Sequence, residues 1–95
     1  MSDYEYGRLG QLLDFPCEVE FRVIIASGVS GALAAVMACL EALRPGSTRG
    51  TRGLPRPSSG GRYFSYTVAV QVENSAHLAE IYTAVSALPP VRHVL

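Results

Sequence analysis

The sequence predicts an α+β fold in which a four-stranded antiparallel sheet carries two helices on one of its faces. Two segments, at 17–26 and 62–73, alternate apolar and polar side chains, which is typical of strands that have one buried face. Two others, at 32–43 and 76–88, repeat apolar residues at helical spacing. Because helices and strands of this kind each need an apolar partner, one helical layer on one sheet face satisfies both.

The first strand is predicted from its alternation of apolar and polar residues, and the first helix from the residues at its two ends. At Cys17–Ala26 the odd positions are apolar and the even ones are mostly charged, and only Ile24 breaks the polar face. The turn SGVSG follows, and its second serine, Ser30, is the predicted N-cap of a helix over Ala32–Leu43. That helix should end before Pro45, because the proline ring cannot continue it.

The second half of the chain repeats this pattern after an irregular segment. Residues 44–61 are rich in Arg, Gly and Pro, which predicts a loop or a frayed edge strand. The second strong strand is expected at 62–73, a helix at 76–88 and a short closing strand at 91–95. The order strand, helix, weak strand, strand, helix, strand is that of a ferredoxin-like βαββαβ sandwich.

The chain length allows one small domain. With 95 residues there is material for a single core, which we place at residues 15–95, with the Arg/Gly/Pro-rich loop at 44–61. Residues 1–14 form an N-terminal extension. The formal net charge is +0 and 48% of the residues are hydrophobic, which excludes intrinsic disorder of the whole chain.

Composition also predicts a cytoplasmic protein without a membrane segment. The longest apolar run, at 31–40, is too short for a membrane helix. The acidic N-terminus does not have the pattern of a signal peptide. Two cysteines in such a chain indicate reduced thiols and therefore the cytoplasm.

No combination of residues predicts catalysis, a metal site or a cofactor. His77 and His93 have no cysteine or carboxylate at a nucleophile or metal spacing. His77 is expected to be solvated or close to a helix cap, and His93 to lie at the edge of the core. Cys17 and Cys39 are expected to be structural thiols. The sequence thus predicts a protein that is not an enzyme.

Several motifs resemble the YbeD-like family of small bacterial proteins. They are LLDFP at 12–16, PSSG at 57–60, His77 near the start of the second helix, and VRHVL at 91–95. They occur in the family's order, and the resemblance covers residues 10–95. It implies a fold similar to ACT-type regulatory domains, which bind small ligands such as amino acids at subunit interfaces. It also implies no established enzymatic activity, and an association with lipoate metabolism.

The turn between the first strand and the first helix is the predicted ligand site. This turn lines ligand sites in ACT-like folds, so the resemblance implies Ser27, Gly28 and Ser30 as ligand-binding residues. Backbone N–H groups at a helix start also favour anions, although this turn lacks the spacing and the lysine of a P-loop. The alternative is a capped turn without a ligand.

The Arg-rich segment is the second candidate site. Arg49, Arg52, Arg56 and Arg62 lie in a span without an acidic residue, which favours binding of an anion or a partner. A solvated loop is the alternative. The sequence therefore predicts a regulatory or small-ligand-sensing domain, and the second hypothesis is an adaptor that binds a protein or RNA through this hairpin.

Nucleic-acid binding by the sheet itself is not expected. The parity of Phe64 and Tyr66 directs these rings towards the helices, where they cannot stack on bases. Glu18 and Glu20 on the opposite face repel phosphate. Because that face is mostly polar, the sequence predicts a monomer or a weak dimer.

Overall fold

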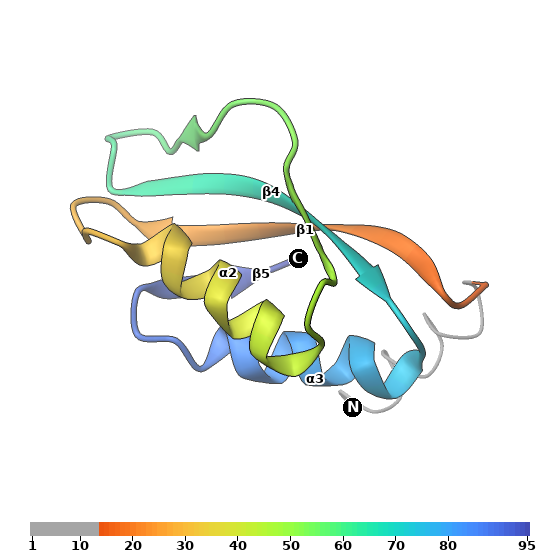
Figure 1. Cartoon of the computed structure of the whole chain (residues 1–95). Coiled ribbons are helices and arrows are strands. Elements are labelled where there is room, and N and C mark those ends of the chain that lie inside the picture. The colour runs from red at the N-terminus through yellow and green to blue at the C-terminus, as the bar shows by residue number, and fades with distance from the viewer. Residues whose placement is uncertain (1–13) are drawn as a thin grey trace.

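The computed structural model describes residues 14–95, so the N-terminal extension up to residue 13 lies outside the described residues. The elements follow the predicted order, with one additional short strand (Figure 1). They are β1 (Cys17–Ala26), α2 (Ala32–Leu43), β2 (Thr48–Thr51), β3 (Arg56–Pro57), β4 (Tyr63–Val72), α3 (Ser75–Ser86) and β5 (Val91–Val94). None of the described helices is long and apolar enough to cross a membrane.

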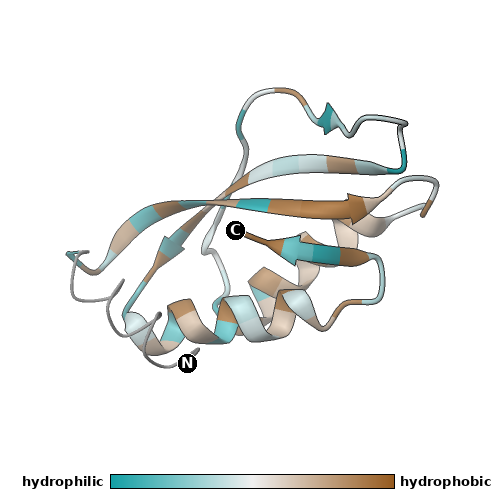
Figure 2. Ribbon diagram, turned by 180° about the vertical axis from the view of Figure 1, so that it is seen from behind, coloured by the Kyte–Doolittle hydropathy of each residue, from teal (hydrophilic) through white to brown (hydrophobic). Residues whose placement is uncertain are grey.

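The strands form one antiparallel sheet, and both helices cover the same face of it (Figures 1 and 2). The strand order is β2-β4-β1-β5, and β3 pairs with β4 as well. The two long strands therefore lie side by side at the centre, as in a ferredoxin-like sandwich. We call the face without helices the open face.

The Arg-rich segment contains two strands, so the sheet has five strands where the sequence predicts four. Thr48, Thr51 and Arg56 all pair with β4. Gly50 and Gly53 between them have φ angles of 84° and 71°, a left-handed conformation that glycine adopts without strain. Gly50 lies inside β2 and Gly53 between β2 and β3, so this edge of the sheet consists of two short irregular strands, which explains why the segment reads as a loop in the sequence.

The side chains of β1 and β4 point to the faces of the sheet that their alternation predicts. The strands pair over their full length, with Phe21 opposite Val68 on the helix side and Glu20 opposite Ala69 on the open face. The core joins the helix side of the sheet to the apolar sides of α2 and α3. Its buried members are Phe21, Val23, Ile25, Ala32, Val36, Leu40, Val68, Val70, Val72, Leu78, Ile81, Val85 and Val91.

Two side chains of β4 differ from expectation in their burial. Phe64 has the helix-side parity but is only half-buried, because it stands at the start of the strand and lines a surface groove. Ala69 lies on the open face but is fully buried. Arg52 and Glu18, from the two sides of β4, form an ion pair of 3.2 Å. This pair crosses over β4 on the open face.

The N-cap of α3 is a side-chain cap, whereas the predicted N-cap of α2 is wrong. Asn74 caps α3, and its side-chain oxygen accepts a hydrogen bond from the backbone N–H of His77 at 2.8 Å. The N-cap of α2 is Gly31 rather than Ser30, and it makes no side-chain capping bond. Gly31 has a φ of 75°, and this left-handed conformation favours glycine over serine.

Candidate functional site

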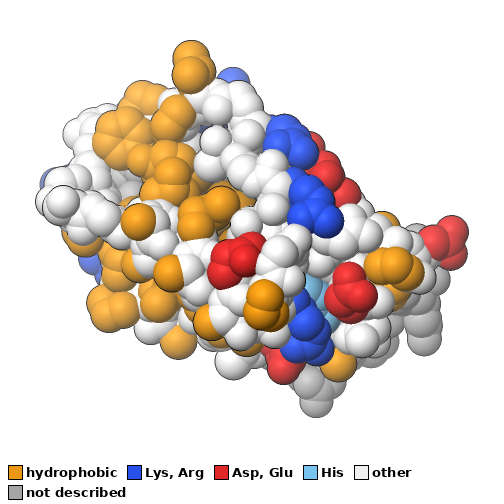
Figure 3. Space-filling view, in the orientation of Figure 1, with side chains coloured by type: hydrophobic (Ala, Val, Ile, Leu, Met, Phe, Trp, Pro, Cys, Tyr) orange, Lys and Arg blue, Asp and Glu red, His pale blue; other side chains and the backbone are white. Residues whose placement is uncertain are grey.

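A groove beside the β1–α2 turn contains two of the three predicted ligand-binding residues. It has a volume of about 250 Å³, and Ser27 and Gly28 line it, whereas Ser30 does not. Phe64 and Tyr66 of β4 form its aromatic wall. Figure 3 shows hydrophobic side chains gathered at this end of the helical face, and charged ones at the other end. The groove is therefore mainly apolar.

Two sets of polar groups surround this groove, namely those of Ser27 and the backbone N–H groups of the first turn of α2. The Ser27 hydroxyl donates to the carbonyl of Gly61 at 2.7 Å, and the Ser27 N–H donates to the carbonyl of Arg62 at 2.8 Å. Ser27 thus ties the β1–α2 turn to the turn before β4. The first turn of α2 has neither a side-chain cap nor an acidic residue. Its backbone N–H groups therefore remain available to an anion.

The four arginines of the second candidate site are not gathered at one place. Arg49 donates to the carbonyls of Gly46 at 2.6 Å and Thr48 at 3.3 Å. Arg52 donates to the carbonyl of Arg49 at 2.8 Å and pairs with Glu18. These two side chains therefore stabilise the hairpin.

The other two arginines of this set have different surroundings. Arg56 lies in β3 and pairs with Ser65 of β4. Arg62 is exposed in the turn that precedes β4. The anion-binding cluster that the sequence suggests is thus divided between a hairpin and the edge of the sheet.

A larger groove of about 470 Å³ separates the α2–β2 loop from the start of α3. Arg44, Arg49, Gln71 and Asn74 are among the residues that line it. The loop on one side is fixed by Glu41, whose carboxylate accepts three hydrogen bonds. These come from the Gly46 N–H at 2.7 Å, the Thr48 N–H at 3.0 Å and the Thr48 hydroxyl at 2.6 Å.

These hydrogen bonds predict an unusually acidic Glu41. The Thr48 hydroxyl and the two N–H groups lower the pKa of Glu41 to about 2. We expect a carboxyl-detected NMR titration to show Glu41 ionised well below pH 4, and the variant Thr48→Val to raise this pKa. An unchanged titration midpoint in Thr48→Val would mean that the hydroxyl does not stabilise the carboxylate. The loop geometry is expected to be held above pH 4.5 and lost as the pH falls through about 2.

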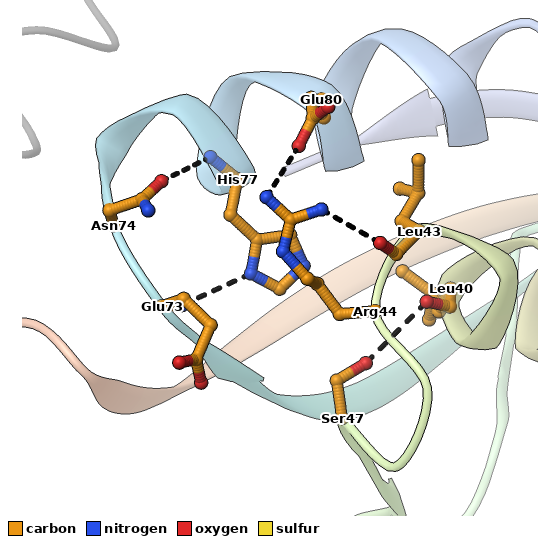
Figure 4. Close-up of polar contacts among 8 residues, drawn as sticks. All are labelled: Leu40, Leu43, Arg44, Ser47, Glu73, Asn74, His77 and Glu80. Carbon is orange, nitrogen blue, oxygen red and sulfur yellow. Dashed lines mark hydrogen bonds and ion pairs between the residues drawn. The ribbon is translucent and has the colours of Figure 1, made fainter.

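His77 is hydrogen-bonded to Glu73 and Asn74, two residues that line this groove. It is close to the helix cap, as predicted, but its ring is fully buried rather than solvated. Its Nδ1 atom accepts from the Glu73 N–H at 3.0 Å, which places the ring proton on Nε2, and Nε2 has no partner. Figure 4 shows Arg44 beside the ring, held by the Leu43 carbonyl and by Glu80 at 3.4 Å.

Burial is the main cause of the lowered pKa of His77. Removal from water lowers its pKa, and the positive charge of Arg44 acts in the same direction, against Glu80 and Glu73. His77 is therefore a neutral hydrogen-bond acceptor for the β4–α3 junction. Sequence reasoning missed this burial because the ring is covered by Arg44, which is distant in the sequence.

The thiols have the surroundings of structural cysteines. Cys17 and Cys39 are both free and half-buried, and burial raises the pKa of Cys39. Residues 14–95 contain no group of three or more His, Cys, Asp or Glu side chains that could hold a metal ion.

Comparison with known proteins places the chain in a family. Residues 10–95 match the family described as "Protein of unknown function (DUF493)". The chain belongs to this family. It is 35% identical over 88 residues to a UPF0250 protein of Idiomarina loihiensis, which covers 93% of this chain and 96% of the relative. It is 37% identical over 86 residues to one of Paraburkholderia phymatum, which covers 88% and 92%. The resemblance to the YbeD-like family is confirmed.

The fold of this DUF493 chain is also found in a solved structure. The solution structure of HP0495 from H. pylori superposes with a TM-score of 0.65. The alignment covers 87% of this chain and 85% of that one, at 22% sequence identity. This likeness supports the α+β architecture.

Proposed function

We propose that this DUF493 protein is a non-enzymatic regulatory domain that senses a small ligand in the groove beside the β1–α2 turn. The observation that carries the proposal is that Phe64 and Tyr66, two aromatic side chains of the central strand β4, remain half-buried at this groove. Apolar surface of this kind at a concave site is typical of ligand pockets. The ligand-binding turn that the YbeD-like resemblance implies lies at the same place.

The groove chemistry favours a small carboxylic acid with an apolar chain. The uncapped first turn of α2 offers N–H groups and the positive end of the helix dipole to a carboxylate. Leu33, Phe64 and Tyr66 offer an apolar wall for the rest of the ligand. At about 250 Å³, the groove is smaller than most pockets for drug-sized ligands. Lipoate and octanoate each combine a carboxylate with an apolar chain, and the association with lipoate metabolism that the YbeD-like resemblance implies makes them the first probes.

Several observations support a binding role over catalysis. His77 is buried with Nδ1 engaged by a backbone N–H, and the raised pKa of Cys39 disfavours its thiolate. Neither residue lines the groove beside the β1–α2 turn. The adaptor hypothesis has less support, because Arg49 and Arg52 are occupied by hydrogen bonds within the hairpin. Since the open face is mostly polar, we continue to expect a monomer or a weak dimer.

Chemical-shift mapping of the full chain tests the ligand site. We expect octanoate or lipoate to shift the amide signals of Gly28, Gly31 and Leu33, and to raise the Tm with the logarithm of ligand concentration. The variant Phe64→Ala should weaken binding about tenfold, which corresponds to roughly 1.4 kcal/mol of lost contact.

Two controls decide between this groove and other surfaces. Leu54→Ala removes an exposed apolar side chain outside the groove and should leave affinity unchanged. Octanol, which lacks the carboxylate, should bind more weakly than octanoate. Shifts confined to the 44–49 loop would instead place the ligand in the larger groove and contradict the proposal.

A further inference from the structure

We infer that one half of the open face binds single-stranded nucleic acid. This basic half-face comprises Arg22 of β1, Arg56 of β3, Arg92 and His93 of β5, and Tyr63 of β4. The inference is independent of the proposed ligand groove, which lies on the helix side of the sheet.

Strand pairing places these residues on one face. Ser65 of β4 pairs with Ile24 on one side and with Arg56 on the other, and Ile24 pairs in turn with His93. Directly paired residues share a face, so these four residues form a row across β5, β1, β4 and β3. Arg22 precedes Ile24 by two positions on β1 and therefore points in the same direction.

An irregularity in β5 adds Arg92 to this surface. The β1–β5 register shifts between Ile24 and Ile25, and Arg92 is the additional residue of β5. A hollow of about 400 Å³ on this surface is lined by Tyr63, Arg92 and His93, together with Ile24 and Ser58. Figure 2 shows the hydrophilic middle of β5 beside β1.

The charges of the basic half-face are not compensated. Within residues 14–95, Arg22, Arg56 and Arg92 have neither an ion pair nor a side-chain hydrogen bond, whereas Arg44 and Arg52 are paired with glutamates. No Asp or Glu lines this hollow or the adjoining one of about 180 Å³, which contains Arg22 and Arg56. Charge complementarity therefore requires an anionic partner.

The spacing of these charges favours a polyanion. The row extends over four strands, which is roughly 14 Å at the usual strand separation. A single phosphate or carboxylate cannot contact both Arg56 at one end of such a row and Arg92 and His93 at the other, but an extended chain of phosphates can.

The rings of the basic half-face favour nucleic acid over an acidic peptide. Tyr63 and His93 offer planar side chains on which unpaired bases stack, and guanidinium groups stack in the same way. The expectation against nucleic acid rested on Phe64 and Tyr66, which do face the helices, and on Glu18 and Glu20 of the open face. Glu18 is neutralised by Arg52, and Glu20 lies at the border of the basic half-face, two residues before Arg22 on β1.

Fluorescence anisotropy with a labelled single-stranded oligonucleotide of about 12 residues tests this inference. We expect saturable binding of the full chain at about 50 mM salt, with a slope of log K against log salt of about −2 for three phosphate contacts. Arg56→Gln and Arg92→Gln should each weaken binding and reduce the slope by about 0.7. Tyr63→Leu should weaken binding about tenfold without changing the slope.

Two charge variants, one in β2 and one in β1, test whether binding depends on the basic half-face. Arg49→Gln removes one positive charge from β2, outside the basic half-face, and should leave the affinity within about twofold. Glu20→Gln removes the carboxylate next to Arg22 on β1 and should tighten binding.

Four outcomes would overturn the inference. One is an absence of saturable binding at low salt, and another is equal loss in Arg49→Gln and Arg56→Gln. A third is an unchanged affinity in Tyr63→Leu. The fourth is competition by oligoglutamate as effective as that by unlabelled oligonucleotide, which would assign the surface to an acidic protein.

Discussion

Replacing Phe21 by alanine is expected to lower the free energy of unfolding by about 3–5 kcal/mol. Phe21 is 2% exposed and stands in the middle of β1, opposite Val68. Its ring meets Tyr82 of α3 edge to face, with centroids 5.3 Å apart and an interplanar angle of 72°. Truncation therefore leaves a cavity and separates β1 from α3.

The size of this loss is best judged against a second phenylalanine on the same face. Phe64 is half-buried, so Phe64→Ala should cost only about 1–2 kcal/mol, less than the parity of β4 alone suggests. Urea unfolding followed by circular dichroism at 222 nm gives both values, because the chain has no tryptophan. Equal losses in the two variants would contradict the different burial of the two rings.

The long elements could be predicted because each has a strong periodic signal. The alternation in β1 and β4 assigns Phe21 and Val70 to the core, and both are buried. Periodicity is weakest where the strands are short. β2 and β3 have four and two residues and contain or adjoin left-handed glycines, so their pairing depends on β4 rather than on their own sequence.

The cap of α2 shows where local reasoning is insufficient. A serine before a helix is a good N-cap in general, and the local sequence therefore favours Ser30 as the N-cap of α2. The chain enters α2 with a left-handed residue, and this conformation selects Gly31. The choice between two adjacent residues depends on the direction of the preceding turn, which the sequence does not specify.

The candidate sites were predictable only in part, for a related reason. Ser27 and Gly28 are local to the groove, but its aromatic wall comes from Phe64 and Tyr66 on another strand. The Arg-rich segment is continuous in sequence, yet its cations lie apart because Arg52 forms an ion pair with Glu18. The basic half-face joins β1, β3, β4 and β5, so it becomes visible only with the strand order.

The second large effect is expected for His77→Ala, with a loss of about 2–4 kcal/mol in unfolding free energy. The variant removes a fully buried ring and leaves the Glu73 N–H without its acceptor. His93→Ala is the matched control, since His93 is exposed on β5 and its truncation should cost less than about 0.5 kcal/mol. A loss in His77→Ala as small as that in His93→Ala would show that the ring does not support the β4–α3 junction.

The pH dependence of stability separates the hydrogen-bonding role of His77 from simple packing. Its pKa is lowered in the folded protein from an ordinary value of 6.5, so the unfolded chain binds the proton more readily. The free energy of unfolding should therefore fall as the pH decreases below about 6.5, and should be independent of this group at higher pH. Glu41 contributes little to the slope in this window, because its stabilising effect is lost mainly as the pH falls from 4.5 to about 2. We expect urea midpoints measured between pH 7 and 5 to decrease more steeply in the wild type than in His77→Ala. Equal slopes would mean that protonation of His77 does not oppose folding.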